Sequence, residues 1–348
     1  MPSLYIEMED FKMKEAMFYE KLGDEVVKCN LCSHRCRITD SKRGICAVRE
    51  NRNGTLYSLV YGKAIARAVD PIEKKPFFHF LPGSRAYSIA TAGCNFRCGN
   101  CQNFEISQMP RDHNMILGQN VSPEEIVMAA KRNNCESIAY TYTEPTIFFE
   151  YAYDTAKLAS KEGIKNVFVT NGYITEEALV EIKPYLDAAN IDLKSFSDEF
   201  HRKNCGARLN PVLDSIRLHK NLGIWIEITT LIIPTLNDSE EELRKIAEFI
   251  KEVGEEIPWH ISQFYPMYKL LDLPRTPIAT LRRAREIGLE VGLRYVYEGN
   301  VPGEAGENTY CYKCGKLLIR RYGYQILGNR IKNSACSYCG AKIDGVNV

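Results

Sequence analysis

Between about residues 86 and 300 the chain alternates short apolar runs with longer segments whose apolar residues recur at helical spacing. The runs are rich in Ile, Val, Tyr and Thr and almost continuously apolar, as strands covered on both faces are. They lie at residues 87–93, 137–142, 166–172, 190–194, 224–233, 259–266 and 294–300. We expect them to form one parallel sheet, because repeated strand–helix units of this length imply right-handed crossovers.

Two of the intervening helices have starts that are visible in the sequence. The segment Ser122-Pro123-Glu124-Glu125 has a capping-box pattern with Pro at the first helical position. Ser239 precedes three glutamates in the same way, and Gly254 is the expected end of that helix. The number of strand–helix units predicts an α/β fold with a full or partial TIM-type β/α barrel. In such a barrel the functional residues lie at the carboxyl ends of the strands.

The net charge, the apolar runs and the first residues of the chain exclude several classes of protein. A net charge of +1 over 348 residues gives no general attraction to nucleic acid or to an anionic membrane. No apolar run approaches the roughly 18 residues of a spanning helix. The chain begins with an acidic, mixed segment rather than with a basic-then-apolar signal. We therefore expect a cytoplasmic protein without a membrane partner.

Eleven of the thirteen cysteines fall into three tight groups, which in an intracellular chain indicates metal ligation. The groups are Cys29, Cys32, Cys36 and Cys46; Cys94, Cys98 and Cys101; and Cys311, Cys314, Cys336 and Cys339. The strand–helix alternation contains the middle group but does not extend into the two segments that carry the first and the third group. We therefore predict an N-terminal Cys-rich module at 1–85, a barrel at 86–303 and a zinc-ribbon-like module at 304–348.

The middle group has C-x3-C-x2-C spacing directly after the first predicted strand. Buried structural cysteines do not fit, because Asn, Arg and Gly lie between them. A zinc site completed by a distant ligand fits less well, since zinc ligands come in separated pairs. A [4Fe-4S] cluster held by three thiolates leaves its fourth iron free to bind a substrate. The spacing therefore favours an iron–sulfur cluster with an open iron.

This loop resembles that of the radical S-adenosylmethionine (SAM) superfamily. The segments "CNLCSHRCRI" and "GCNFRC" are similar to those of pyruvate formate-lyase activating enzyme relatives and of the radical SAM member of the AmmeMemoRadiSam set. The resemblance implies that Cys94, Cys98 and Cys101 ligate the cluster and are catalytic. It also implies that SAM is bound by residues in "TYTEPT", "VTNG", "IDLK" and "WHISQFYP". These residues are Glu144, Thr170, Asn171, Asp192, Lys194 and His260.

The resemblance further implies a reaction. Reductive cleavage of SAM would give a 5′-deoxyadenosyl radical, which abstracts hydrogen from an unidentified substrate. A partner protein, as in glycyl-radical activation, is one candidate substrate. A ferredoxin or a flavodoxin would be the electron donor.

The two flanking groups predict further metal sites. The knuckles "CYKCG" and "CSYCG" have the spacing of a zinc ribbon, so Zn²⁺ is expected at Cys311, Cys314, Cys336 and Cys339. The N-terminal group offers four thiolates and predicts a closed site. Its spacing leaves zinc and a second [4Fe-4S] cluster open, with zinc slightly favoured.

Two other functions remain open at this point. The C-terminal segment is basic and carries interleaved tyrosines, which would suit radical SAM modification of RNA. A solvated basic surface explains the same residues and is favoured. An alternative of another class is a non-catalytic scaffold protein in which all three cysteine groups bind zinc.

Overall fold

The computed structural model describes residues 13–348, and its centre is one eight-stranded sheet. The strand order is β16-β15-β14-β13-β12-β11-β9-β8, and every pair from β9 to β16 is parallel. The parallel strands are β9 (Arg85–Ala90), β11 (Ser137–Tyr140), β12 (Lys165–Thr170), β13 (Ala188–Asp192), β14 (Trp225–Ile232), β15 (Trp259–Gln263) and β16 (Val296–Gly299). Each overlaps one of the predicted apolar runs. β8 (Ala66–Pro71) pairs antiparallel with β9 at one edge.

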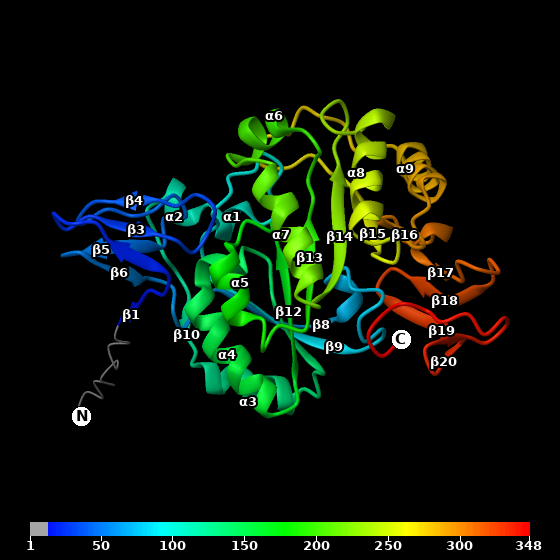
Figure 1. The fold of residues 1–348 in the computed structure, drawn as a ribbon, viewed down its shortest axis with the longest axis horizontal. Coiled ribbons are helices and arrows are strands. Elements are labelled where there is room, and N and C mark those ends of the chain that lie inside the picture. The colour runs from blue at the N-terminus through cyan, green and yellow to red at the C-terminus, as the bar shows by residue number, and fades with distance from the viewer. Residues whose placement is uncertain (1–12) are drawn as a thin grey trace, which may run out of the picture.

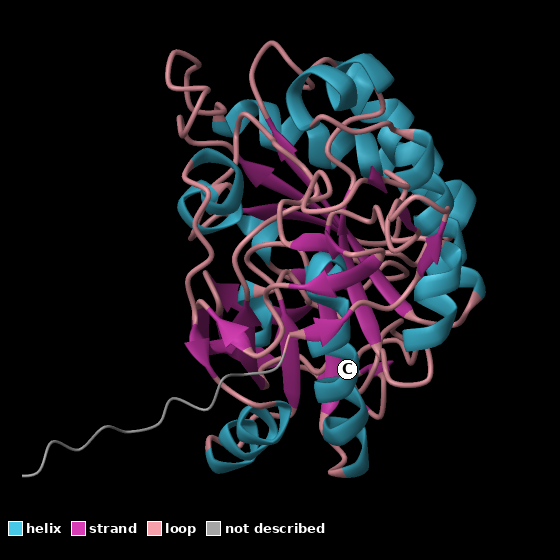
Figure 2. Cartoon of the chain, turned by 90° about the vertical axis from the view of Figure 1, so that its left-hand side faces the viewer, coloured by secondary structure: helices cyan, strands magenta, loops and turns pink. Residues whose placement is uncertain are grey.

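The helices lie along the outside of this curved sheet (Figures 1 and 2). Those that connect the strands are α3 (Pro123–Arg132), α4 (Phe149–Lys161), α5 (Glu176–Ile182), α7 (Asn210–Asn221), α8 (Glu240–Val253) and α9 (Ile278–Val291). The edge strands β8 and β16 do not pair with each other within residues 13–348, so the barrel is open. The predicted α/β fold is confirmed in its partial-barrel form.

Short helical turns lie mainly in the loops around the site. They are α1 (Phe104–Ser107), α2 (Met109–Asp112), α6 (Asp198–Phe200), the 3₁₀ turns Ile72–Lys74, Pro145–Phe148 and Ala305–Glu307, and a π turn at His201–Cys205.

The two predicted helix starts differ in one respect. The Ser122 hydroxyl accepts from the Glu125 amide at 3.2 Å, and the Glu125 carboxylate accepts from the Ser122 amide at 2.7 Å, which confirms a complete capping box. The Ser239 hydroxyl accepts from the Glu242 amide in the same way. The Glu242 carboxylate, however, accepts from the Ser195 hydroxyl and the Phe196 amide instead of reaching back. Glu242 thus fixes the loop after β13.

The segment before the barrel forms small antiparallel sheets at one side of the central sheet (Figure 1). Its strands are β1 (Lys14–Glu15), β2 (Tyr19–Lys21), β3 (Val27–Cys29), β4 (Arg37–Ile38), β5 (Arg49–Arg52), β6 (Thr55–Ser58) and β7 (Lys63–Ala64), which pairs with β10 (Gln119–Asn120). It is joined to α4 by a buried ion pair between Arg49 and Glu150 at 2.9 Å.

The segment after the barrel lies on the opposite side (Figure 1). Its strands are β17 (Thr309–Tyr310), β18 (Leu317–Tyr322), β19 (Gln325–Asn329), β20 (Ile331–Lys332) and β21 (Ala335–Cys336). Buried Arg321 donates to the Phe78 carbonyl oxygen at 3.1 Å, and the His79 imidazole donates to the Asp344 carbonyl oxygen at 2.6 Å. The predicted module boundaries stay predictions, although β8 shows that residues before 86 belong to the central sheet.

No helix within residues 13–348 is long and apolar enough to cross a bilayer. The acidic start of the sequence lies largely outside the described residues.

Candidate functional site

A cavity of about 420 Å³ lies at the carboxyl ends of the parallel strands. Every residue that the radical SAM resemblance singled out lines this cavity. These residues are Cys94, Cys98, Cys101, Glu144, Thr170, Asn171, Asp192, Lys194 and His260. The parallel sheet brings most of them together because its strands all end on the same side. His260 was expected at a strand end as well, but it is the second residue of β15 and lies nearer the amino end of that strand.

The three cysteines occupy the loop after β9. The backbone amide of Phe96 donates to the Cys94 sulfur at 3.3 Å, and the Ser107 hydroxyl lies 3.1 Å from the Cys101 sulfur. Within residues 13–348, only the C-terminal quartet brings three or more Cys, His or acidic ligand atoms within 4.8 Å of one another. The loop sulfurs are therefore spread more widely than a mononuclear site needs. Three separated thiols around a large cavity fit a polynuclear cluster.

The environments of these thiols shift their pKa values in different directions. Burial, followed by the nearby Glu144 carboxylate, raises the pKa of Cys94. The hydrogen bond from the Cys205 thiol lowers the pKa of Cys98, against the effect of burial. Cys205 looked like an ordinary small buried residue in the sequence, since it stands alone. Its place against Cys98 depends on the loop after β13.

Glu144 is fully buried and forms the hydrogen-bonding centre of the strand ends. One carboxylate oxygen accepts from the Thr146 amide at 3.0 Å, the Thr146 hydroxyl at 2.6 Å and the Thr170 hydroxyl at 2.7 Å. The other accepts from the Asn171 amide at 2.8 Å. Burial nevertheless raises the pKa of Glu144. The carboxylate thus ties the end of β11 to the turn after β12 and borders the cavity.

Asn171 connects that turn to the cysteine loop. Its side-chain amide donates to the Asn95 side-chain oxygen at 2.7 Å and lies 3.9 Å from the Cys94 sulfur. Its own side-chain oxygen accepts from the Tyr173 amide at 3.0 Å. The turn is therefore held in one orientation relative to Cys94.

Asp192 and Lys194 form an ion pair of 2.7 Å at the end of β13. Burial works against the charge of Lys194, but Asp192 and Cys98 outweigh it and raise the pKa of the ammonium group. This places a permanent positive charge beside the cysteine loop. A carboxylate or a negatively charged cluster is the kind of group that such a charge stabilises.

His260 lines the cavity from β15, but one of its nitrogens is already occupied. Its Nε2 lies 2.6 Å from the carboxylate of buried Glu227 on β14. The same carboxylate accepts from the backbone amides of Phe78 and His79. Sequence reasoning missed Glu227, because a lone acid inside the apolar run of β14 carries no motif.

Other cavity residues come from loops distant in sequence. Lys75 is 2% exposed, pairs with Asp70 at 2.7 Å and lies 4.1 Å from the Tyr142 ring centre. Burial lowers its pKa to about 8. Tyr324 from the C-terminal module also lines the cavity. Tyr142 is the last residue of the predicted apolar run at 137–142, and Tyr324 is one of the tyrosines interleaved in the basic C-terminal segment, whereas Lys75 carried no sequence signal.

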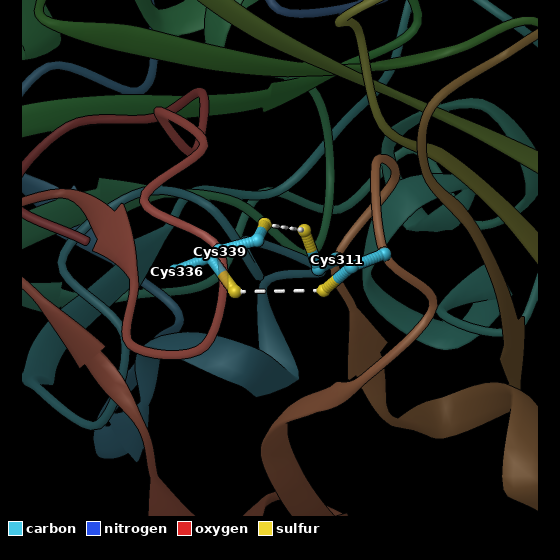
Figure 3. A group of neighbouring side chains, drawn as sticks. Cys311, Cys336 and Cys339 are labelled. Carbon is cyan, nitrogen blue, oxygen red and sulfur yellow. Dashed lines mark hydrogen bonds between the residues drawn. The ribbon is translucent and has the colours of Figure 1, made fainter.

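The C-terminal cysteines have a different geometry. The Cys311 and Cys339 sulfurs lie 3.7 Å apart and the Cys314 and Cys336 sulfurs 3.8 Å apart (Figure 3). A tetrahedral ion with metal–sulfur bonds of about 2.3 Å separates its ligands by about 3.8 Å. The four thiols therefore fit one tetrahedral ion.

The sequence model of the radical SAM superfamily matches residues 88–250, which include the cysteine loop, Glu144 and Asp192. The uncharacterised protein MJ0808 of Methanocaldococcus jannaschii is 51% identical over 335 residues, or 95% of this chain and 99% of that one. The chain belongs to the radical SAM superfamily. It is therefore an enzyme of the radical SAM type, and the alternative of a non-catalytic zinc scaffold is set aside.

Activating enzymes are among the relatives of this radical SAM protein. The pyruvate formate-lyase-activating enzyme of Clostridium pasteurianum is 27% identical, over 62% of this chain and 93% of that one. A solved radical SAM methyltransferase from Sphaerobacter thermophilus has a TM-score of 0.51 at 14% identity, over 66% of this chain and 71% of that one. That likeness shows the fold alone. The chemistry of the family is radical cleavage of SAM.

Proposed function

We propose that Cys94, Cys98 and Cys101 hold a [4Fe-4S] cluster whose open iron binds SAM, and that the enzyme abstracts hydrogen from a substrate in the large cavity. The observation that carries this proposal is that the three cysteines and all six candidate SAM-contacting residues border one cavity. When bound, cluster and SAM supply a 5′-deoxyadenosyl radical. The residues of the chain orient the reactants and exclude water.

Each side chain has a role that follows from its contacts. Lys194 keeps its charge and would face the SAM carboxylate or the cluster. Glu144 holds Thr170 and Asn171 in place, and its Oε2, with one donor in this structure, is the acceptor proposed for the SAM amino group. Asn171 fixes the turn beside Cys94. His260 stands farther along the sheet on β15, where Glu227 fixes its ring for contact with the reacting end.

The test is SAM cleavage after anaerobic reconstitution and reduction with dithionite, with 5′-deoxyadenosine as the measured product. We expect cleavage in the parent protein and none in Cys98→Ala, because that variant loses a cluster ligand. Cys135→Ala is the matched control, since Cys135 is also buried but does not line the cavity. Cleavage by Cys98→Ala at the parent rate would overturn the proposal.

For the substrate we propose a partner protein, as in glycyl-radical activation. The support is the likeness to the Clostridium pasteurianum activating enzyme, whose name states that activity. Transfer of deuterium from a labelled glycine-loop peptide into 5′-deoxyadenosine is the expected signature. Absence of transfer with every glycyl-radical partner offered would count against a protein substrate.

RNA is the second candidate substrate. It is supported by the exposed Tyr322 and Tyr338 on the basic C-terminal module and by Tyr324 at the cavity. Binding of transfer RNA that weakens steeply with salt would favour it. No binding at low salt would exclude it.

We also propose that the C-terminal quartet binds structural Zn²⁺. The spacing of its sulfurs supports this.

A further inference from the structure

The N-terminal cysteines enclose a cavity of their own, separate from the large one. All four thiols of the group line it. Its remaining wall is mainly apolar and includes Leu31, Ile38, Ile45 and Ile147. Cys29 and Cys46 are buried, whereas Cys32 and Cys36 are half-buried. Four thiols that share an apolar cavity form a ready ligand set for a metal centre.

The spacing of these thiols distinguishes one ion from a cluster. Within residues 13–348, the four sulfurs of the C-terminal quartet all lie within 4.8 Å of one another. In the N-terminal group no three sulfurs are that close. A single tetrahedral ion would need separations of about 3.8 Å. A cubane places irons and sulfides between its ligands and so holds them farther apart. The same chain thus offers both geometries, and the N-terminal one fits the cubane.

A buried charged side chain also lines this cavity. Arg49 is 2% exposed and lines the cavity. One of its terminal nitrogens donates to both carboxylate oxygens of Glu150, at 2.9 and 3.0 Å, and the other donates to the Met17 carbonyl oxygen at 2.7 Å. Its Nε has no hydrogen-bond partner within the described chain. A buried N–H without a partner is costly, and a cluster sulfur is an acceptor that would satisfy it.

We propose that Cys29, Cys32, Cys36 and Cys46 bind a second [4Fe-4S] cluster, closed by four thiolates and hydrogen-bonded by Arg49. This goes beyond the proposed function and does not depend on it. Zinc, slightly favoured from the sequence, does not suit the wide sulfur spacing. A cluster here has four protein ligands, so it has no open iron for SAM.

The second site lies directly against the loop of the first. A Cβ added at Gly93 would lie 2.7 Å from Val48 Cγ1 and 3.3 Å from the Cys46 carbonyl oxygen. The His34 imidazole, which lines the N-terminal cavity, donates to the Asn95 carbonyl oxygen at 2.9 Å. Both contacts end next to Cys94. Loops that carry the two ligand sets are therefore in van der Waals and hydrogen-bonding contact.

The experiment compares the full chain with two variants, each reconstituted anaerobically with iron and sulfide. One variant carries Cys94→Ala, Cys98→Ala and Cys101→Ala; the other carries Cys32→Ala and Cys36→Ala, the two half-buried ligands. Iron, sulfide and zinc are counted per chain, and the dithionite-reduced samples are examined by electron paramagnetic resonance. We expect about eight irons in the parent and about four in each variant. The loop triple variant should keep a reduced-cluster signal that SAM does not change.

The outcomes separate the two proposals. Loss of all iron from the loop triple variant, with a second zinc per chain in its place, would overturn the second cluster. Loss of all iron from the Cys32→Ala/Cys36→Ala variant, with four irons kept by the other, would instead overturn the cluster at the SAM site. If a variant fails to fold, the unmodified parent still decides, because about four irons with a reduced-cluster signal that SAM changes completely would leave only the cluster at the SAM site and overturn the second one. Cys135→Ala again controls for the loss of a buried thiol.

Discussion

At the scale of single residues, Glu144 organises more of the site than its motif suggests. Its two oxygens accept four hydrogen bonds from Thr146, Thr170 and Asn171 while it is completely buried. We predict that Glu144→Gln lowers the free energy of unfolding by about 1–3 kcal/mol. The amide NH₂ group of Gln cannot accept a hydrogen bond, so it would leave one or more of these N–H and O–H donors without an acceptor. We also expect weaker SAM binding. Chemical denaturation and equilibrium binding measure the two effects, with exposed Glu124→Gln as control. Unchanged stability would contradict this account of Glu144.

The residues that sequence analysis found and missed differ in one physical respect. Glu144 and Asp192 lie at or near the carboxyl ends of apolar runs, so the barrel rule alone placed them together, whereas His260 is the second residue of β15 and was found only through the family resemblance. Lys75 and Tyr324 reach the same cavity from segments outside the strand–helix repeat. No local pattern encodes that approach, because it depends on how the flanking segments pack.

At the scale of elements, the seven parallel strands were predictable because each is buried on both faces and is therefore continuously apolar. β8 escaped prediction for the opposite reason. It is an antiparallel edge strand with the sequence "ARAVDP", and most of its residues are partly exposed. Its polar positions resemble those of a loop.

Two helix starts with the same sequence pattern should respond differently to mutation. Glu125 serves only its own helix, so Glu125→Ala should cost about 0.5–1 kcal/mol of unfolding free energy. The Glu242 carboxylate instead holds Ser195 and Phe196, so Glu242→Ala should cost more and also loosen the loop after Lys194. Thermal unfolding and hydrogen exchange of residues 195–197 measure this. Equal costs and equal protection would contradict the assigned contacts.

At the scale of the whole molecule, His79 joins the barrel to the C-terminal module. Burial lowers its pKa from the usual 6.5 to about 4, so the folded state keeps it neutral. Its Nδ1 donates to the Asp344 carbonyl oxygen, and its Nε2 accepts from the Tyr297 hydroxyl. As the pH falls below 6.5 the unfolded chain binds a proton that the folded chain does not. Stability should therefore fall between pH 6.5 and 4, by about 3 kcal/mol from this group.

The measurement for His79 is chemical denaturation at several pH values. In His79→Gln the decrease between pH 6.5 and 4 should be smaller than in the parent, whatever its stability at neutral pH. Identical slopes for the two proteins would show that His79 does not carry the effect.

Metal removal tests the same contact between the barrel and the C-terminal module, here through the cysteines of that module. With zinc bound by the C-terminal quartet, chelation should lower the unfolding temperature and release the contacts of Arg321 with Phe78 and Thr309. Cys314→Ser should reproduce this in part, because Cys314 is exposed and little packing is lost with it. A protein that holds no zinc, or that keeps its unfolding temperature after chelation, would contradict the prediction.

The close approach at Gly93 limits how this protein can be rebuilt. The segment around Val48 fills the space that any larger residue at position 93 would need, and Gly93 itself has φ of 103°, a conformation suited to glycine. The N-terminal segment and the barrel look like separable parts in the sequence, yet they share this junction. A chimaera that grafts another family member's N-terminal segment onto this barrel must therefore match residues 46–48 to the backbone at 93 and 94. Recombination between relatives should give a folded protein only where residues 46–48 and residues 93 and 94 come from the same parent sequence.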